Sequence, residues 1–167
     1  MKIKRIITHL FTMQGQVNKA FPRNALKTIE QTIKASEAAH TGEIQFAVED
    51  ALDGRALYKG QTSRERAIEL FAQLRVWDTE HNNGLLIYVL LADRAVEIVA
   101  DRGIHAKVGL EAWSKICRSM EDDFKQSNYE GGLVTGVQAI TQYLAEHFPS
   151  DGFNRNELSD KPIFVRG

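Results

Sequence analysis

The chain contains the segment Leu85-Leu86-Ile87-Tyr88-Val89-Leu90-Leu91-Ala92-Asp93-Arg94-Ala95-Val96-Glu97-Ile98-Val99-Ala100. Its first part is apolar at eight successive positions, which is typical of a strand buried on both faces. Asp93-Arg94 separates this run from a second apolar run, and so short a spacing indicates an antiparallel hairpin, although the glycine favoured in such turns is missing. We therefore predict that residues 85–100 form a hairpin at the centre of a sheet.

The segments on either side of this hairpin predict helices and one further strand. Apolar residues at helical spacing predict helices over 24–39, from Thr62 or Ser63 onward, over about 107–126 and over about 130–147. An alternation of polar and apolar residues predicts a strand over 43–49, and residues 50–60 are expected to form a loop.

The order of these elements predicts the fold class. The strand over 43–49 reaches the hairpin through a helix, so it should lie parallel to the first hairpin strand with a right-handed crossover. We predict an α/β fold, a three-layer sandwich with a small mixed sheet of three to four strands and helices on both faces. The domain would cover residues 24–148, between an N-terminal arm (1–23) and an extended C-terminal tail (149–167).

Composition excludes several classes of protein. The 167 residues include 21 basic and 22 acidic ones, and a net charge of −1 does not recruit nucleic acid. A single cysteine, Cys117, cannot form an internal disulfide, which favours a reducing compartment such as the cytoplasm. No apolar run approaches the roughly 20 residues of a transmembrane helix. The basic N-terminus is interpreted as an arm of the mature chain that can touch a membrane surface through Lys2, Lys4 and Arg5.

Polar residues gather just before and just after the hairpin. Antiparallel pairing about Asp93-Arg94 places residues near 101–103 beside residues near 84–86, so both groups should share one rim of the sheet. Oxygen ligands suit Ca²⁺ and Mg²⁺, and we expect the carboxylates Asp78, Glu80 and Asp101 to hold a divalent cation. The rest of the rim would be lined by Asn82, Asn83, Gly84, Arg102 and Gly103. The other interpretation is structural, with a turn at 82–84, Asp78 capping local backbone, and Asp101 paired with Arg102 or Arg75.

The sequence contains no pattern of a nucleophile paired with a base. Cys117 lies among apolar residues and is interpreted as a buried side chain. His81 lies in the polar loop and is interpreted as an exposed residue, although a role as ligand or general acid stays open. The remaining histidines have no zinc-ligand spacing. Hydrolysis would therefore require a metal-bound water or an aspartate.

Several dispersed segments within about residues 25–147 form a recognisable pattern. They are Thr41-Gly42-Glu43-Ile44, Trp77, Asn83-Gly84-Leu85-Leu86, Asp93-Arg94-Ala95-Val96-Glu97-Ile98, Asp101-Arg102-Gly103-Ile104, Phe124 and Tyr129-Glu130-Gly131-Gly132. Together these segments resemble the TPM domain family. The family includes a thylakoid-lumen protein linked to photosystem II repair and many secreted or membrane-tethered bacterial proteins. The resemblance implies an α/β sandwich and carries over Asn83, Gly84, Asp101 and Gly103 as rim residues. Many members have a signal peptide, a C-terminal membrane helix and a Gly-rich tail, none of which is visible in this sequence.

The resemblance implies three functions. It implies divalent-cation binding in some members, acid phosphatase activity in a plant member, and accessory roles beside membrane protein complexes. Our leading hypothesis is a TPM-like module that binds Ca²⁺ or Mg²⁺ at the rim and acts through a protein partner. The alternatives are an acid phosphatase that uses the same rim and a membrane-surface adaptor that uses the N-terminal arm.

Overall fold

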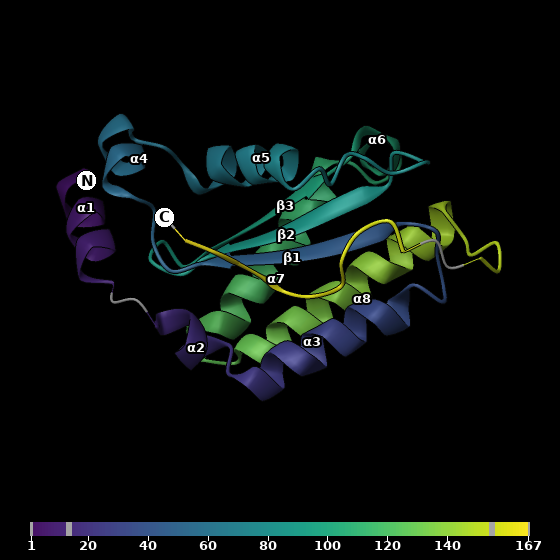
Figure 1. Cartoon of the computed structure of the whole chain (residues 1–167), viewed down its shortest axis with the longest axis horizontal. Coiled ribbons are helices and arrows are strands. Elements are labelled where there is room, and N and C mark those ends of the chain that lie inside the picture. The colour runs from purple at the N-terminus through teal and green to yellow at the C-terminus, as the bar shows by residue number, and fades with distance from the viewer. Residues whose placement is uncertain (1, 13–14, 154–155, 167) are drawn as a thin grey trace.

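The computed structural model describes residues 2–12, 15–153 and 156–166 (Figure 1). The helices are α1 (Lys2–Phe11), α2 (Gln16–Ala20), α3 (Arg23–Ser36), α4 (Gly54–Lys59), α5 (Ser63–Gln73), α6 (Arg102–Val108), α7 (Leu110–Lys125) and α8 (Tyr129–His147). The strands are β1 (Glu43–Glu49), β2 (Gly84–Leu90), β3 (Ala95–Ala100) and β4 (Ile163–Val165).

The four strands form one mixed sheet in the order β3-β2-β1-β4. β1 runs parallel to β2, with Glu43 opposite Gly84, and β4 adds to the free side of β1 in the same direction. β2 and β3 pair antiparallel, with Leu85 opposite Ala100. The predicted hairpin and the predicted parallel pair are both confirmed.

The hairpin turn forms without glycine because Arg94 adopts a left-handed backbone conformation, with φ 52°. Its N–H donates to the carbonyl of Leu91 at 3.0 Å, which closes the turn. A non-glycine residue accepts this conformation at a small steric cost, and the flanking apolar strands offset that cost.

Helices cover both faces of the sheet, as the sequence predicts (Figure 1). α3, α7 and α8 pack on one face, where alternate residues of β1 such as Ile44, Phe46 and Val48 enter the larger core. α5 packs on the opposite face, where Ala47 and Tyr88 lie in a smaller core. The α/β three-layer sandwich is therefore confirmed.

Several segments differ from the expectation. The arm over 1–23 contains α1 and α2, and the tail over 149–167 contains β4. The loop expected over 50–60 contains α4, because Asp53 accepts the N–H of Ala56 at 2.8 Å and so caps a short helix. The helix expected over 107–126 begins earlier and is divided at Gly109, whose φ of 84° ends α6. No helix in the described part of the chain has both the length and the hydropathy needed to cross a bilayer.

Candidate functional site

The two polar turns that flank the hairpin lie against each other. The N–H of Asp101 donates to the carbonyl of Gly84, and the N–H of Gly103 donates to the carbonyl of Asn82, both at 2.9 Å. Because β2 begins where β3 ends, antiparallel pairing requires this contact. The predicted neighbourhood of the two turns is confirmed, and we call this end of the sheet the rim.

Close backbone contacts explain both glycines of the rim. A Cβ on Gly84 would lie 2.0 Å from the carbonyl oxygen of Val76, and a Cβ on Gly103 would lie 2.5 Å from that of Asn82. Real Cβ atoms do not approach a carbonyl this closely, so a side chain at either position would push the two turns apart. Glycine at both positions therefore allows the two turns of the rim to pack closely against each other.

Asn83 lies at the centre of the rim and is fully buried. Its Nδ2 donates to the Thr41 hydroxyl at 3.3 Å, and its backbone N–H donates to the Thr79 hydroxyl at 3.2 Å. Its Oδ1 is buried and has no hydrogen-bond partner among the described residues. A buried amide oxygen without a donor is costly, and an unfilled acceptor of this kind suits a cation or a ligand N–H.

Asp101 caps α6 and retains one unused oxygen. Its Oδ1 accepts the N–H of Arg102 at 2.7 Å at the start of the helix. Its Oδ2 is shielded from solvent and accepts no hydrogen bond from the part of the chain that the structure describes. The rim therefore presents two buried acceptor oxygens, one from each of the turns that the hairpin joins.

The other predicted ligands do not complete this arrangement. Asp78 is exposed and binds Arg75 at 2.8 Å, because the two residues lie three positions apart in the turn that follows α5, where the N–H of Asp78 donates to the carbonyl of Arg75 at 2.9 Å. Glu80 is exposed, and its backbone N–H donates to the Glu157 carboxylate at 3.1 Å. Arg102 is also exposed. Asp78, Glu80 and Asp101 do not form a group with ligand atoms within 4.8 Å, so the structure does not bring this expected ligand set together.

A different carboxylate group lies at the same end of the sheet. Within residues 2–12, 15–153 and 156–166, one trio of carboxylates has ligand atoms within 4.8 Å of one another, and it consists of Glu37, Glu43 and Asp160. Glu43 accepts the backbone N–H groups of Glu157 at 2.9 Å and Leu158 at 3.3 Å. Burial raises the pKa of Glu43, and the nearby carboxylates of Glu157 and Asp160 add to this effect, against the two backbone N–H groups. No pattern in the sequence indicates the trio, because its members come from the end of α3, the start of β1 and the C-terminal segment.

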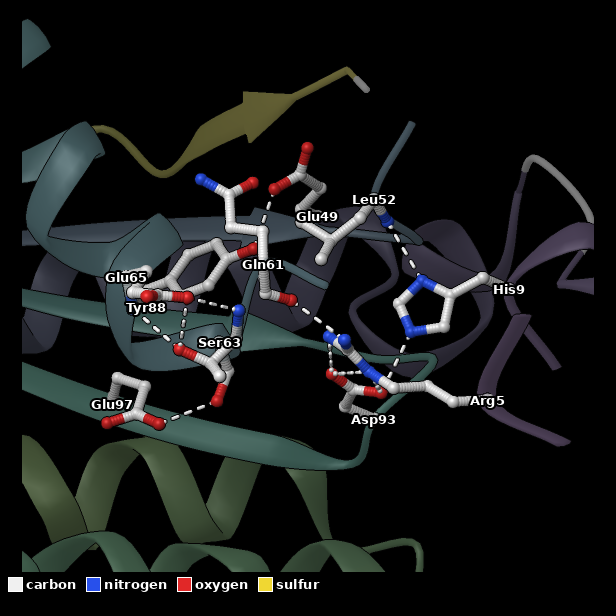
Figure 2. A network of polar contacts seen from close by, with 11 residues as sticks. Arg5, His9, Glu49, Leu52, Gln61, Ser63, Glu65, Tyr88, Asp93 and Glu97 are labelled. Carbon is white, nitrogen blue, oxygen red and sulfur yellow. Dashed lines mark hydrogen bonds and ion pairs between the residues drawn. The ribbon is translucent and has the colours of Figure 1, made fainter. Parts of the chain in front are cut away.

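A second polar network lies at the opposite end of the hairpin, where α1 meets the turn between β2 and β3 (Figure 2). Asp93 accepts three hydrogen bonds from Arg5, at 2.7 to 3.1 Å, and one from His9 Nε2 at 2.8 Å. The other ring nitrogen of His9, Nδ1, accepts the N–H of Leu52 at 3.1 Å. This contact fixes the tautomer, since Nε2 must then carry the proton that points at Asp93.

Potential nucleophiles outside the rim are poorly placed for chemistry. Burial, with the carboxylate of Glu97, raises the pKa of the Cys117 thiol to about 12, so the thiol stays protonated. Ser36 and His40 form a hydrogen bond of 3.3 Å, but both side chains are buried. Burial lowers the pKa of His40 to about 4, against a backbone contact with Gly42.

Comparison with known proteins identifies the family. The model of the TPM domain matches residues 17–143. The BA42 protein of the psychrophilic bacterium Bizionia argentinensis is similar in structure, with a TM-score of 0.75 and 28% identity over 85% of this chain and 93% of BA42. The N-terminal domain of a P. gingivalis protein shares the fold, with a TM-score of 0.60 and 23% identity over 77% of this chain and 81% of that domain. A comparison with curated protein sequences found no match. The chain belongs to the TPM domain family.

Proposed function

We propose that this TPM domain binds a divalent cation, Ca²⁺ or Mg²⁺, at the rim. One observation carries the proposal, the pair of buried and unpartnered oxygens, Asn83 Oδ1 and Asp101 Oδ2, on two turns that are hydrogen-bonded to each other. Hard cations bind carboxylate and amide oxygens and complete their shells with backbone carbonyls and water. Asn83 and Asp101 would supply two of the oxygen ligands, in place of the larger set that included Asp78 and Glu80.

The carboxylate trio supports the proposal through its charge. Glu43 stands directly opposite Gly84 in the sheet, so Glu37, Glu43 and Asp160 lie at the same end as the rim. Acidic groups that line one end of a sheet raise the local concentration of cations. The trio would therefore draw a dication towards the rim.

We further propose that the cation-loaded rim serves a protein partner and not a hydrolytic reaction. Within the described residues, the pair of Ser36 and His40 is buried and the Cys117 thiol is held protonated, so neither offers a nucleophile to a substrate. An ion held by two connected turns would instead fix their shape for docking, which is a common use of bound cations.

A metal titration of the labelled protein followed by NMR tests the proposal. Backbone signals of residues 82–84 and 101–103 should shift with millimolar Ca²⁺ or Mg²⁺. Asp101→Asn keeps the helix cap, because asparagine caps helices as well as aspartate does. It should nevertheless weaken metal binding by about tenfold or more. Asp78→Asn is the matched control, since it removes an exposed carboxylate from the same region and should leave metal affinity unchanged.

Two outcomes would contradict the proposal. Shifts confined to residues around Glu37, Glu43 and Asp160, with Glu43→Gln weakening binding and Asp101→Asn neutral, would move the ion to the trio. Metal-dependent hydrolysis of p-nitrophenyl phosphate that Asp101→Asn abolishes and Asp78→Asn retains would replace the docking role with a phosphatase role.

A further inference from the structure

Helix α1 exposes an apolar stripe. Ile3 is 74% exposed, Ile7 48%, Leu10 69% and Phe11 79%. Their spacing is i, i+4, i+7 and i+8, which places them on one face of the helix. Single exposed apolar residues are common on protein surfaces. Four large ones on one face of a short helix form an apolar patch whose exposure to water is unfavourable.

The opposite face of α1 attaches the helix to the domain through polar contacts. Arg5 and His9 both bind Asp93, and Arg5 Nη1 also donates to the carbonyl of Gln61 at 2.7 Å (Figure 2). Ile6 adds a partly buried contact with the smaller core. These contacts fix the rotation of α1 about its own axis. The apolar stripe is therefore held outward and is not free to turn inward.

The charge of the N-terminal region is uniformly positive. The first 29 residues contain six basic residues and no acidic one, whereas the whole chain has a net charge of −1. Lys4 is exposed on α1, and Lys19, Arg23 and Lys27 are exposed on α2 and α3. Figure 1 places α1, α2 and the beginning of α3 at the same end of the molecule. An anionic surface would complement this end.

We propose that α1 is a membrane-surface helix whose apolar stripe, Ile3, Ile7, Leu10 and Phe11, enters the interface of an anionic lipid bilayer. Helices of this type lie in the plane of the interface, bury one apolar face among the acyl chains and keep basic residues among the headgroups. A second copy of the chain is a poorer occupant, because packing two α1 helices face to face would bring together two regions of the same charge. An anionic lipid surface can bury the apolar stripe among its acyl chains and attract the basic residues to its headgroups.

The proposal goes beyond cation binding at the rim and is independent of it. α1 contacts Asp93 in the turn at the opposite end of the hairpin from Asn83 and Asp101. The domain would thus lie on a membrane through α1 while the rim stays at the far end of the sheet. A protein that fails to bind metal can still bind membranes.

Cosedimentation of the full chain with vesicles tests the proposal. The protein should pellet with vesicles of phosphatidylglycerol mixed into phosphatidylcholine, and less with pure phosphatidylcholine. Added salt should weaken binding, since the charged contribution is screened. The double variant Ile7→Ser, Phe11→Ser should lower the membrane-bound fraction by about tenfold or more. Leu110→Ser is the matched control, because Leu110 is 62% exposed at the start of α7 and lies outside α1.

A fluorescence variant locates the contact. In Phe11→Trp the emission should shift to the blue on addition of anionic vesicles, against the background of Trp77 and Trp113 measured in the unsubstituted protein. Three results would overturn the proposal. They are no pelleting of the intact protein with anionic vesicles, equal pelleting of the double variant, and a lipid-free dimer in light scattering that the double variant dissociates.

Discussion

Arg5 and Asp93 lie 88 positions apart in the chain, and their side chains form a two-pronged ion pair with N–O distances of 2.9, 3.1 and 2.7 Å. His9 binds the same carboxylate from the next turn of α1. One aspartate of a hairpin turn therefore orients the whole N-terminal helix.

Asp93→Asn should loosen α1 while leaving the domain folded. The substitution removes the charge that two partners share, and hydrogen bonds to charged groups contribute about 1.5–3 kcal/mol. Amide hydrogen exchange within residues 2–12 should become faster, and exchange in β1 and β2 should not change. Asp122→Asn is the control, since it removes a carboxylate that pairs with Lys125 in an exposed position on α7.

Acid should have the same effect on α1. Burial raises the pKa of Asp93, but hydrogen bonds from Arg5 and His9 outweigh it and hold the pKa below the usual 3.8. A carboxylate with a lowered pKa stabilises the fold above pH 3.8, and the contribution is lost as the pH falls through the lower value. If α1 keeps the same protection from amide hydrogen exchange in Asp93→Asn, Asp93 does not attach the helix to the domain in the way described.

Arg66→Met should destabilise the protein more than Tyr88→Phe. Glu49 is buried between them, and it accepts two hydrogen bonds from Arg66, at 3.0 and 3.1 Å, and one from the Tyr88 hydroxyl at 2.6 Å. Loss of Arg66 leaves a buried charge without its partner, at a cost of about 3–5 kcal/mol. Loss of the hydroxyl removes one hydrogen bond to a charged group, worth about 1.5–3 kcal/mol. Urea denaturation of both variants measures the difference, and equal losses would contradict this account of the contact between Arg66 and Glu49.

Gly84→Ala should destabilise the rim, whereas Gly54→Ala should not. The added methyl of Gly84→Ala would meet the Val76 carbonyl at 2.0 Å, and such overpacking costs about 1–3 kcal/mol or more. Gly54 has nothing within 4 Å of its Cβ position and lies at the start of α4, so alanine there is neutral or slightly stabilising. Denaturation midpoints compare the two variants. Equal stability would mean that the turn over residues 76–84 moves away freely.

His40 should make the fold less stable in mild acid. Burial lowers its pKa from 6.5 to about 4, so as the pH falls the unfolded chain takes up a proton before the folded chain does. The free energy of unfolding should therefore fall between pH 6.5 and pH 4, by at most about 1.4 kcal/mol per pH unit. The measurement is the difference between the unsubstituted protein and His40→Gln at several pH values, since subtraction removes the opposite contribution of Glu43. Parallel pH profiles would contradict it.

The sequence predicts the central elements of the fold because their signals are local and strong. The apolar run of β2, the short spacing before β3 and the alternation in β1 each define a strand without reference to the rest of the chain. α1 and α4 give weaker signals. α1 exposes its apolar face in place of burying it, and α4 has six residues of which only Leu57 is buried.

The rim illustrates the limit of sequence reasoning about a site. The two apolar runs and the short turn between them predict that β2 pairs with β3. This pairing in turn predicts the contact between the turns of Asn82 and Gly103. The orientation of each carboxylate side chain depends on the hydrogen-bond donor that lies nearest to it, and the spacing of residues in the sequence does not identify that donor. Asp78 turns to Arg75, and Asp101 turns to the N–H of Arg102. The trio with Asp160 depends on the path of the C-terminal segment, which has no periodic pattern to predict it.

β4 has a consequence for how the protein is synthesised. It occupies the flank of β1 that no other strand covers, yet it is the last of the described elements to leave the ribosome. Until β4 is in place, a nascent chain that has already paired β1, β2 and β3 exposes the edge of β1. The unpaired backbone groups of this edge can pair with a neighbouring polypeptide. The three residues of β4 thus cover the exposed edge of β1. Slow translation of the segment that contains β4 would prolong the interval in which polysome-bound chains can aggregate.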